Sequence, residues 1–470
     1  MCSPSPAFLI ASLPDEVRRL EETGRFSEAV HVINRILAEN EEAPSILASR
    51  LRWEPERIER MKKDFALSEE EAFQRLKAKI PDLRLEEFRA WIRESLVESR
   101  EIEGETRVFN SFLPNLMRDS LEARRRAKDV DDVPERARNL LHQHIDDLFA
   151  VGVNSGTRYV KPVRNRILMT LRVKPDAVPD GEVSRVWLPF PTKDPLQPEA
   201  RVVSSSPSDY VLSPGESPQR TIYLEAEASR GKGLELRVEY EYMALACYRE
   251  VNLTKTAYHS KDEPQEEYLS EQLPHIAFTP YLRKIAEEIV SSEPNQCQRA
   301  WRIYSWITQN IKYALVPEYS TIECISEYAA RNLRGDCGVM ALLFTALCRI
   351  AGVPARWQSG WYLNPVRPSP HDWAQFYVEP YGWLYADPSF GGHEISNEKY
   401  HRFYFGNIDH FRLAANVDIC SDFHPPKIHY RSDTVDNQRG EVEWRGGNVY
   451  FDGFSSEMKV LSQENITDEP

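Results

Sequence analysis

The first 150 residues carry a helical pattern of apolar positions. Apolar residues recur there at three- and four-residue spacing, as in the set Phe26, Ala29, Val30, Ile33 and Leu37, which places them on one face of a helix. The run from Ser68 to Glu71 has the form of a capping box that opens another helix. We therefore expect residues 1–150 to form an all-α helical domain.

Between Arg164 and Tyr248 the apolar positions alternate with the opposite face, as they do in strands that are buried on one side. The alternation is clearest from Ile167 to Val173 and from Leu234 to Tyr242. Clusters of turn-forming residues separate these runs. This pattern predicts a β-sandwich domain over residues 158–255.

Helical periodicity returns from Leu282 to Val290 and from Cys297 to Ile311. A loop, a strongly apolar helix and a group of strands follow, up to about Asp387, so we expect a mixed domain over residues 256–425. Two short runs flank Gly446-Gly447 and predict a hairpin, which makes residues 426–470 a C-terminal β-hairpin extension. The expected fold class is α+β with several domains.

Composition narrows the classes of partner. Hydrophobic residues make up 41% and aromatic residues 11% of the 470 residues, which is enough for packed cores. The formal net charge of -14 argues against binding to nucleic acid or to an anionic membrane, because both require a basic face. No apolar run reaches the roughly 18 residues that span a bilayer, so we expect no membrane span.

The seven cysteines are scattered, without a Cys-x-x-Cys pair or a Cys/His cluster at zinc spacing. We therefore expect reduced thiols, no metal site and no cofactor. The N-terminus has a short apolar stretch but no basic region before it and no clear cleavage site. We expect a cytoplasmic protein, or a secreted or envelope protein if a leader has been removed, and the oligomeric state stays open.

Cys337 lies at the start of the most apolar helix. Gly335 permits a tight entry to this helix, and Gly352 followed by Val-Pro is a stop signal. The helix is apolar almost all round, so we expect it to be buried. At its N-terminus, unpaired amide groups and the helix dipole favour a thiolate over a thiol, which suits a nucleophile. The alternative is a small buried hydrophobic residue, as expected for Cys348.

A predicted hairpin downstream supplies the partners for a thiol. The run from His371 to Val378 is expected to form a strand, and Trp383 to Asp387 is expected to return beside it after a turn. The hairpin brings Asp387 near His371, and a carboxylate beside an imidazole holds its tautomer and stabilises the imidazolium. Asp372 points to the opposite face, so we do not expect it to orient His371. The order Cys-His-Asp on a helix and two strands predicts a catalytic triad.

The runs Gly335-Asp336-Cys337-Gly338, His371-Asp372-Trp373-Ala374 and Gly382 to Ser389 resemble the core of the transglutaminase-like superfamily. The resemblance is strongest from Gly335 to Phe390. It implies a papain-like catalytic core in which Cys337 is the nucleophile, His371 the general base and Asp387 the residue that orients the histidine. The β-domain before the core is similar to the layout of bacterial transglutaminase-like cysteine proteases.

The resemblance also has limits. The calcium-dependent animal transglutaminases have extra β-domains after the core, whereas only a short tail follows here. The peptide N-glycanases carry paired zinc-binding cysteines that this sequence lacks. The segment around Tyr313 resembles the family's region before the cysteine, which makes Tyr313 a candidate oxyanion donor. A core tyrosine at the end of a helix is an equally good interpretation of this residue.

The family chemistry implies a thiol enzyme that forms a thioester acyl-enzyme from an amide or ester. Water then gives a peptidase or amidase, and an amine gives transglutaminase-type transfer to glutamine side chains. We favour hydrolysis of amide or peptide bonds, because nothing in the sequence suggests an amine tunnel or calcium control. The alternatives are an arylamine-acetylating acyltransferase and a non-catalytic peptide-binding scaffold with the same fold.

Aromatic residues are dense around the predicted site, and they suit a cleft that grips a peptide or protein substrate. Trp361 and Trp373 are the candidates for the cleft walls. Ordinary packing of the sheet is the alternative interpretation of both residues.

Overall fold

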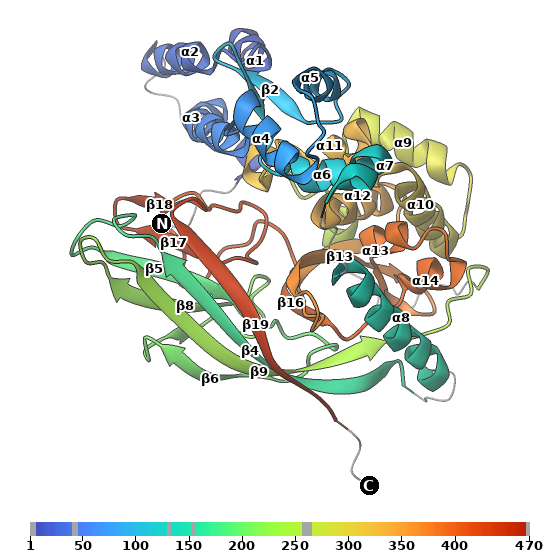
Figure 1. Cartoon of the computed structure of the whole chain (residues 1–470). Coiled ribbons are helices and arrows are strands. Elements are labelled where there is room, and N and C mark those ends of the chain that lie inside the picture. The colour runs from blue at the N-terminus through green and yellow to red at the C-terminus, as the bar shows by residue number, and fades with distance from the viewer. Residues whose placement is uncertain (1–5, 40–45, 129–132, 153–156, 256–265, 467–470) are drawn as a thin grey trace. The chain divides into compact units, whose positions relative to one another are not determined.

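The structure is a computed structural model of the whole chain, and it describes residues 6–39, 46–128, 133–152, 157–255 and 266–466 (Figure 1). Contacts within the chain group it into two compact units. One, which we call the helical unit, comprises residues 6–132 and 314–325. The other, the core unit, contains residues 133–313 and 326–470. The boundaries of the four domains expected from the sequence stay a prediction.

The helical unit confirms the helices expected from the apolar spacing. Its helices are η1 (Pro6–Ile10), α1 (Asp15–Glu22), α2 (Phe26–Glu39), α3 (Ile46–Asp64), α4 (Glu69–Lys79), α5 (Leu85–Arg93), α6 (Phe112–Asp119) and α7 (Leu121–Arg126). The capping box is also confirmed, because Ser68 Oγ accepts from the Glu71 amide and the Glu71 carboxylate accepts from the Ser68 amide. A small antiparallel sheet was not expected; it orders β1 (Leu67–Ser68), β3 (Glu105–Val108) and β2 (Ser99–Ile102) as β1-β3-β2.

A segment from much later in the sequence completes the helical unit. Residues 314–325, which include η3 (Tyr319–Thr321), belong to this unit although they lie between two elements of the core unit. The side chain of Asn115 accepts from the Leu315 amide at 2.8 Å and donates to the Leu315 carbonyl at 2.9 Å. Arg57 Nη1 donates to the carbonyl of Thr321 at 2.9 Å. The helical unit therefore fixes the main chain of this segment.

Two antiparallel sheets form the sandwich of the core unit (Figure 1). One has the order β19-β4-β9-β6 and the other β18-β17-β5-β8-β7. Their strands are β4 (Tyr159–Val173), β5 (Val183–Pro189), β6 (Ala200–Ser206), β7 (Val211–Leu212), β8 (Thr221–Glu227), β9 (Leu234–Cys247), β17 (Glu441–Trp444), β18 (Gly447–Val449) and β19 (Phe454–Asn465). The alternating residues, such as Ile167 and Leu171, meet Val186 and Leu224 of the facing sheet in one buried cluster.

The C-terminal residues belong to this sandwich. β17 and β18 pair as the hairpin expected around Gly446-Gly447, with Val442 opposite Val449. β17 also pairs with β5, and β19 pairs with β4 along nearly its full length. The last strands therefore add to both sheets, where the sequence alone suggested a separate extension. This pairing depends on residues more than 200 positions apart, which local patterns do not reveal.

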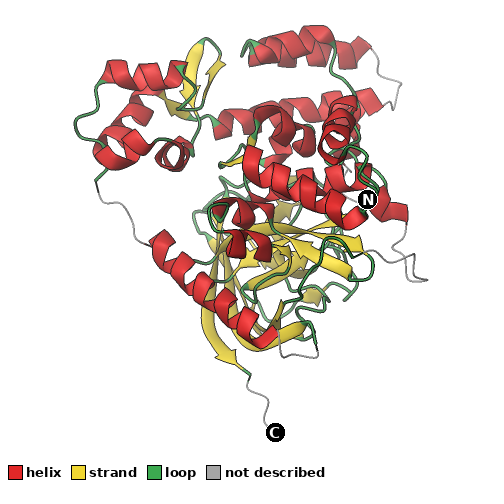
Figure 2. Ribbon diagram, turned by 90° about the vertical axis from the view of Figure 1, so that its right-hand side faces the viewer, coloured by secondary structure: helices red, strands yellow, loops and turns green. Residues whose placement is uncertain are grey.

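The rest of the core unit is a five-stranded antiparallel sheet with helices beside it (Figure 2). The sheet has the order β15-β14-β13-β12-β16. Its strands are β12 (Ala355–Tyr362), β13 (Ser369–Val378), β14 (Gly382–Ala386), β15 (Phe405–Gly406) and β16 (Arg412–Asn416), and a short parallel pair is formed by β10 (Lys312–Tyr313) and β11 (Arg334–Gly335). The helices are α8 (Val133–Gly152), η2 (Glu266–Leu269), α9 (Pro280–Val290), α10 (Gln296–Asn310), α11 (Ile325–Asn332), α12 (Cys337–Ile350), α13 (Pro388–His393) and α14 (Glu398–Phe403).

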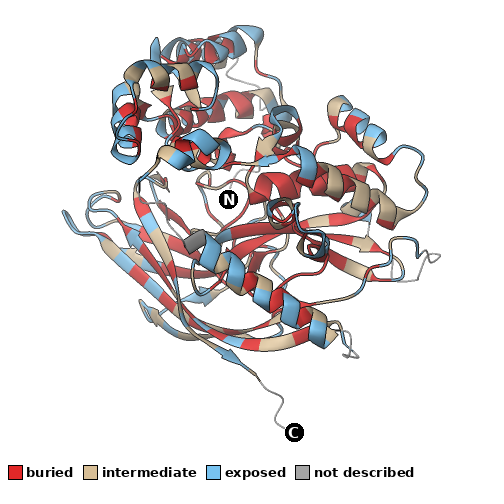
Figure 3. Ribbon diagram, turned by 45° about the vertical axis from the view of Figure 1, so that its right-hand side comes forward, coloured by how far each residue is buried: buried red, intermediate tan, exposed pale blue. Residues whose placement is uncertain are grey.

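Helix α12 is the centre of this layer. Every residue from Cys337 to Arg349 is buried, which confirms the burial expected from its apolar sequence (Figure 3). Phe344 of α12 packs edge-on against Phe376 of β13, with ring centroids 5.8 Å apart. The structure thus confirms the α+β class and packs α12 against the sheet that carries His371.

Candidate functional site

The entry to α12 fixes the position of Cys337. Asp336 caps the helix, and its Oδ1 accepts a hydrogen bond from the Val339 amide at 3.1 Å. Gly335 precedes it in β11, where a Cβ atom would lie only 2.3 Å from Cγ1 of Val339. Only glycine fits at that position, which explains the tight entry. Cys337 follows as the first residue of α12, and 8% of its surface is exposed.

The thiol of Cys337 has a carboxyl group as its hydrogen-bond partner. Sγ donates to Oδ2 of Asp372 at 3.0 Å. Burial is the largest cause that raises the pKa of the Cys337 thiol. Burial thus acts against the thiolate expected at the helix N-terminus, because desolvation of the sulfur favours the neutral thiol.

His371 and Asp387 form a buried pair. Nε2 of His371 lies 2.7 Å from Oδ2 of Asp387, and the two residues are only 4% and 0% exposed. Asp387 follows β14 and caps α13, where its Oδ1 accepts from the Phe390 amide and the Ser389 hydroxyl. The hairpin of β13 and β14 brings the pair together, as expected from the sequence. Burial lowers the pKa of His371, although Asp387 acts in the opposite direction.

The structure places the thiol beside β13, the strand that carries His371. Cys337 contacts Asp372, which directly follows His371 in β13. Within the described residues, neither Cys337 Sγ nor any other group hydrogen-bonds Nδ1 of His371. The structure therefore joins His371 to Asp387 and Cys337 to Asp372. The three catalytic roles expected from the sequence stay predictions.

Arg412 is a member of the site that the sequence analysis missed. From β16, its Nη1 donates to Asp387 Oδ2 at 2.8 Å and its Nη2 donates to Asp409 Oδ2 at 2.7 Å. Burial acts to raise the pKa of Asp387, but His371 and Arg412 outweigh it and hold that pKa below its usual range. The guanidinium also lies over the ring of Phe390, 4.7 Å from its centroid.

Asp372 is also new to the site. The sequence analysis excluded it as the partner of His371, and the imidazole does pair with Asp387. Asp372 instead meets the thiol with Oδ2 and accepts from Nε2 of Gln438 with Oδ1 at 2.8 Å. Gln438 belongs to the loop before β17, and its carbonyl accepts from Nε1 of Trp361 at 2.8 Å. No local pattern pointed to this loop.

The other candidate residues lie in packed surroundings. Trp373 is fully buried and its Nε1 donates to Gln358 at 2.7 Å. Trp361 belongs to the buried cluster of the sandwich. The structure therefore places neither tryptophan as an open cleft wall, and both serve sheet packing. Tyr313 is half-buried in β10, opposite Gly335 of β11, and its role as an oxyanion donor stays a prediction.

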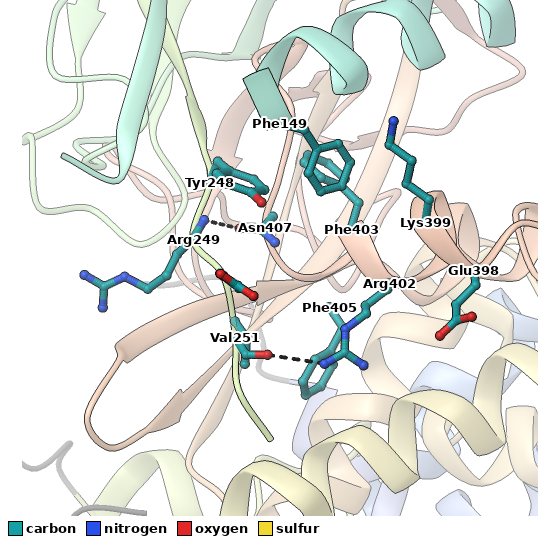
Figure 4. Close-up of a pocket in the computed structure, with 11 residues that line it drawn as sticks. Phe149, Tyr248, Arg249, Val251, Glu398, Lys399, Arg402, Phe403, Phe405 and Asn407 are labelled. Atoms are coloured by element: carbon teal, nitrogen blue, oxygen red, sulfur yellow. Dashed lines mark hydrogen bonds between the residues drawn. The ribbon is translucent and has the colours of Figure 1, made fainter. Parts of the chain in front are cut away.

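A pocket of about 440 Å³ lies elsewhere in the core unit (Figure 4). Its walls come from α8, the residues that follow β9, α14 and β15, and they include Phe149, Arg249, Lys399 and Arg402. None of the predicted site residues lines it. Its cations already have partners, since Lys399 pairs with Asp146, and Arg402 and Arg249 donate to main-chain carbonyls.

Two further observations concern metal binding and membrane spans among the described residues. No group of three or more His, Cys, Asp or Glu side chains among them is arranged to hold a metal ion. In the same part of the chain, no helix has the length and apolar character needed to cross a membrane.

Comparisons with known proteins give one family match and solved structures of low identity. The transglutaminase-like superfamily matches residues 283–388. A solved structure named "putative cysteine protease" from Cytophaga hutchinsonii is 14% identical, with a TM-score of 0.42; the match covers 66% of this chain and 94% of that one. The periplasmic domain of TgpA from Pseudomonas aeruginosa is 12% identical, with a TM-score of 0.26; that match covers 53% and 98%. Curated proteins give no match to this chain.

Proposed function

Residues 283–388 form a transglutaminase-like domain, and we propose that it catalyses cysteine-dependent acyl transfer with Cys337 as nucleophile, His371 as general base and Asp387 as orienter. The preferred reaction is hydrolysis of an amide or peptide bond in a peptide or protein substrate. The observation that carries the proposal is the buried pair of His371 and Asp387, whose histidine lies on the strand that Cys337 contacts.

The proposed reaction begins with a proton transfer. Because Nε2 of His371 is bound to Asp387, the proton of the Cys337 thiol goes to Nδ1. The sulfur attacks the carbonyl carbon and gives a tetrahedral oxyanion. The imidazolium then protonates the leaving amine, the carbon–nitrogen bond breaks and a thioester remains on Cys337. Water, deprotonated by the same imidazole, attacks the thioester and releases a carboxylic acid and the thiol.

The charges around the pair suit this cycle. The Asp387 carboxylate is ionised and faces the imidazole, so it stabilises the imidazolium as it forms. Arg412 limits that stabilisation, because it shares the same carboxylate oxygen and lowers the pKa of His371. An imidazolium with a lower pKa gives its proton to the leaving amine more readily. The arrangement therefore favours a base that returns its proton within one turnover.

A digest of a peptide library tests the proposal. The full chain and the Cys337→Ser variant are incubated with the library, and the products are identified by mass spectrometry. The proposal expects cleavage that disappears in Cys337→Ser and is strongly slowed in His371→Ala. Equal cleavage by all three proteins would contradict it.

Addition of a labelled primary amine to the same digest separates the two fates of the thioester. Hydrolysis gives new carboxyl termini without label, whereas amine transfer incorporates the label at glutamine side chains. We expect hydrolysis to dominate. Incorporation without cleavage would instead assign the domain to amine transfer.

A further inference from the structure

The carboxyl group of Asp372 is held in one orientation. Gln438 Nε2 donates to Asp372 Oδ1 at 2.8 Å and to the main-chain carbonyl of His371 at 3.1 Å. A carbonyl oxygen can only accept, so the atom of Gln438 that faces it must be the amide nitrogen. Oδ1 of Asp372 is therefore an acceptor. If the carboxyl group carries a proton, that proton lies on Oδ2, the oxygen 3.0 Å from Cys337 Sγ.

The surroundings of Asp372 favour the neutral acid. Asp372 is 3% exposed, and among the described residues no Lys, Arg or His pairs with it. Asp436 is buried close by, with its Oδ2 accepting from the Ser359 hydroxyl. A buried carboxylate without a cation keeps its proton, because ionisation would cost its full desolvation.

The charged groups near Asp372 also favour its neutral form, and the nearby cations act on Asp436 instead. Burial raises the pKa of Asp372, and Asp436, Asp336 and Asp433 raise it further. The hydrogen bond with the thiol opposes them without reversing the shift. The nearby cations Arg431 and Arg439 act on Asp436, whose pKa is nevertheless raised by burial and by Asp433.

We propose that Asp372 is a further catalytic residue, a neutral acid whose O–H donates a hydrogen bond to the sulfur of Cys337 while the thiolate attacks. This role rests on the proposed function of Cys337 as the nucleophile. The thiol proton moves to His371, and Asp372 keeps its own proton throughout. The hydrogen bond is strongest to the thiolate and weakens once the sulfur–carbon bond has formed and the charge has moved to the carbonyl oxygen.

The opposite role has a distinct signature. An ionised Asp372 would repel the thiolate and keep Cys337 unreactive. Asparagine separates the two cases, because its carboxamide has the same shape and its Nδ2–H can donate to sulfur while its oxygen accepts from Gln438. Alanine removes the donor altogether.

The test follows the reactivity of Cys337 without any substrate. The rate of alkylation by iodoacetamide is measured across pH on the full chain, with the Cys337 peptide resolved by mass spectrometry. We expect Asp372→Ala to slow alkylation at pH 7 by about tenfold or more, since hydrogen bonds to charged groups are worth that much. The alkylation rate should fall less in Asp372→Asn than in Asp372→Ala. The pH profile of alkylation in Asp372→Ala should move to higher pH. The buried Asp194→Asn, which changes the partner of Gln358, is the matched control.

Faster alkylation in both Asp372 variants would overturn the proposal, and so would three identical profiles. Infrared spectroscopy of the wild type and Asp372→Asn provides a second test. We expect the wild type to show at neutral pH the carbonyl band of a protonated acid that Asp372→Asn lacks, and the absence of that difference would refute a neutral Asp372. Failure of the proposed function is recognised separately, because it appears as cleavage that survives Cys337→Ser.

Discussion

Arg412 donates to the same oxygen of Asp387, Oδ2, that binds the imidazole of His371. A single carboxylate oxygen thus binds both the imidazole of His371 and the guanidinium of Arg412, and both contacts are buried. Asp409 takes the other side of the guanidinium. The imidazole of His371 is consequently one end of a buried array of charges, whose members depend on one another.

Replacement of Arg412 by methionine should be strongly destabilising. The variant leaves Asp387 and Asp409 without their common cation in a buried site, and loss of one partner of such a network costs about 3–5 kcal/mol. Denaturant unfolding measures the change. Arg166→Met removes an exposed ion pair with Glu239 and should cost no more than about 1 kcal/mol. Similar losses in the two variants would contradict a structural role for the array.

Acid should destabilise the protein partly through His275. This histidine is fully buried, no described residue bonds either ring nitrogen, and burial lowers its pKa to about 3. The unfolded chain therefore binds a proton below about pH 6.5 that the folded chain excludes, and stability falls as the pH falls. His275→Leu should remove about 2 kcal/mol of the loss between pH 7.5 and 5. Urea unfolding at the two pH values, with the exposed His424→Leu as control, measures this difference.

The pH dependence of kcat/KM should be a broad bell. The active form carries one proton between Cys337 and His371. Burial lowers the pKa of His371 below 6.5, so the second proton that inactivates the site binds only in more acidic solution. Burial raises the pKa of Cys337 above 9.0, so the last proton is lost only in more alkaline solution. A pH–rate profile on a library-derived peptide tests this, and an alkaline limb near neutral pH would count against the raised thiol pKa.

The side chain of Asn115 should control the order of residues 314–325. It makes two hydrogen bonds to the main chain of Leu315, so Asn115→Ala removes both and should cost about 1–3 kcal/mol. Hydrogen exchange at the Leu315 amide should become faster. The exposed Asn332→Ala, which loses one bond to Tyr328 in α11, should leave the Leu315 amide unchanged. Equal protection of Leu315 in all three proteins would show that Asn115 does not hold the segment.

What the sequence predicted depended on local patterns. The burial of α12 followed from its apolar residues, and the approach of His371 to Asp387 followed from two strands joined by a short turn. Arg412 and Gln438 were not predicted as site residues, because their positions depend on contacts between distant segments. β16 pairs with β12, and the loop before β17 comes from the C-terminal part of the chain. The rise in the pKa of the Cys337 thiol was not expected, because the helix dipole is visible in a sequence and the burial of the sulfur is not.

Acylation of Cys337 is the event on which the account depends, and it can be measured directly. The full chain is mixed with the library peptide that it cleaves fastest, the reaction is quenched in acid within the first turnovers, and the Cys337 peptide is weighed by mass spectrometry. We predict a mass increase equal to the acyl half of the substrate, lost on treatment with hydroxylamine and much slower to form in His371→Ala. Cleavage that proceeds with Cys337 unmodified throughout, and at full rate in Cys337→Ser, would contradict the account.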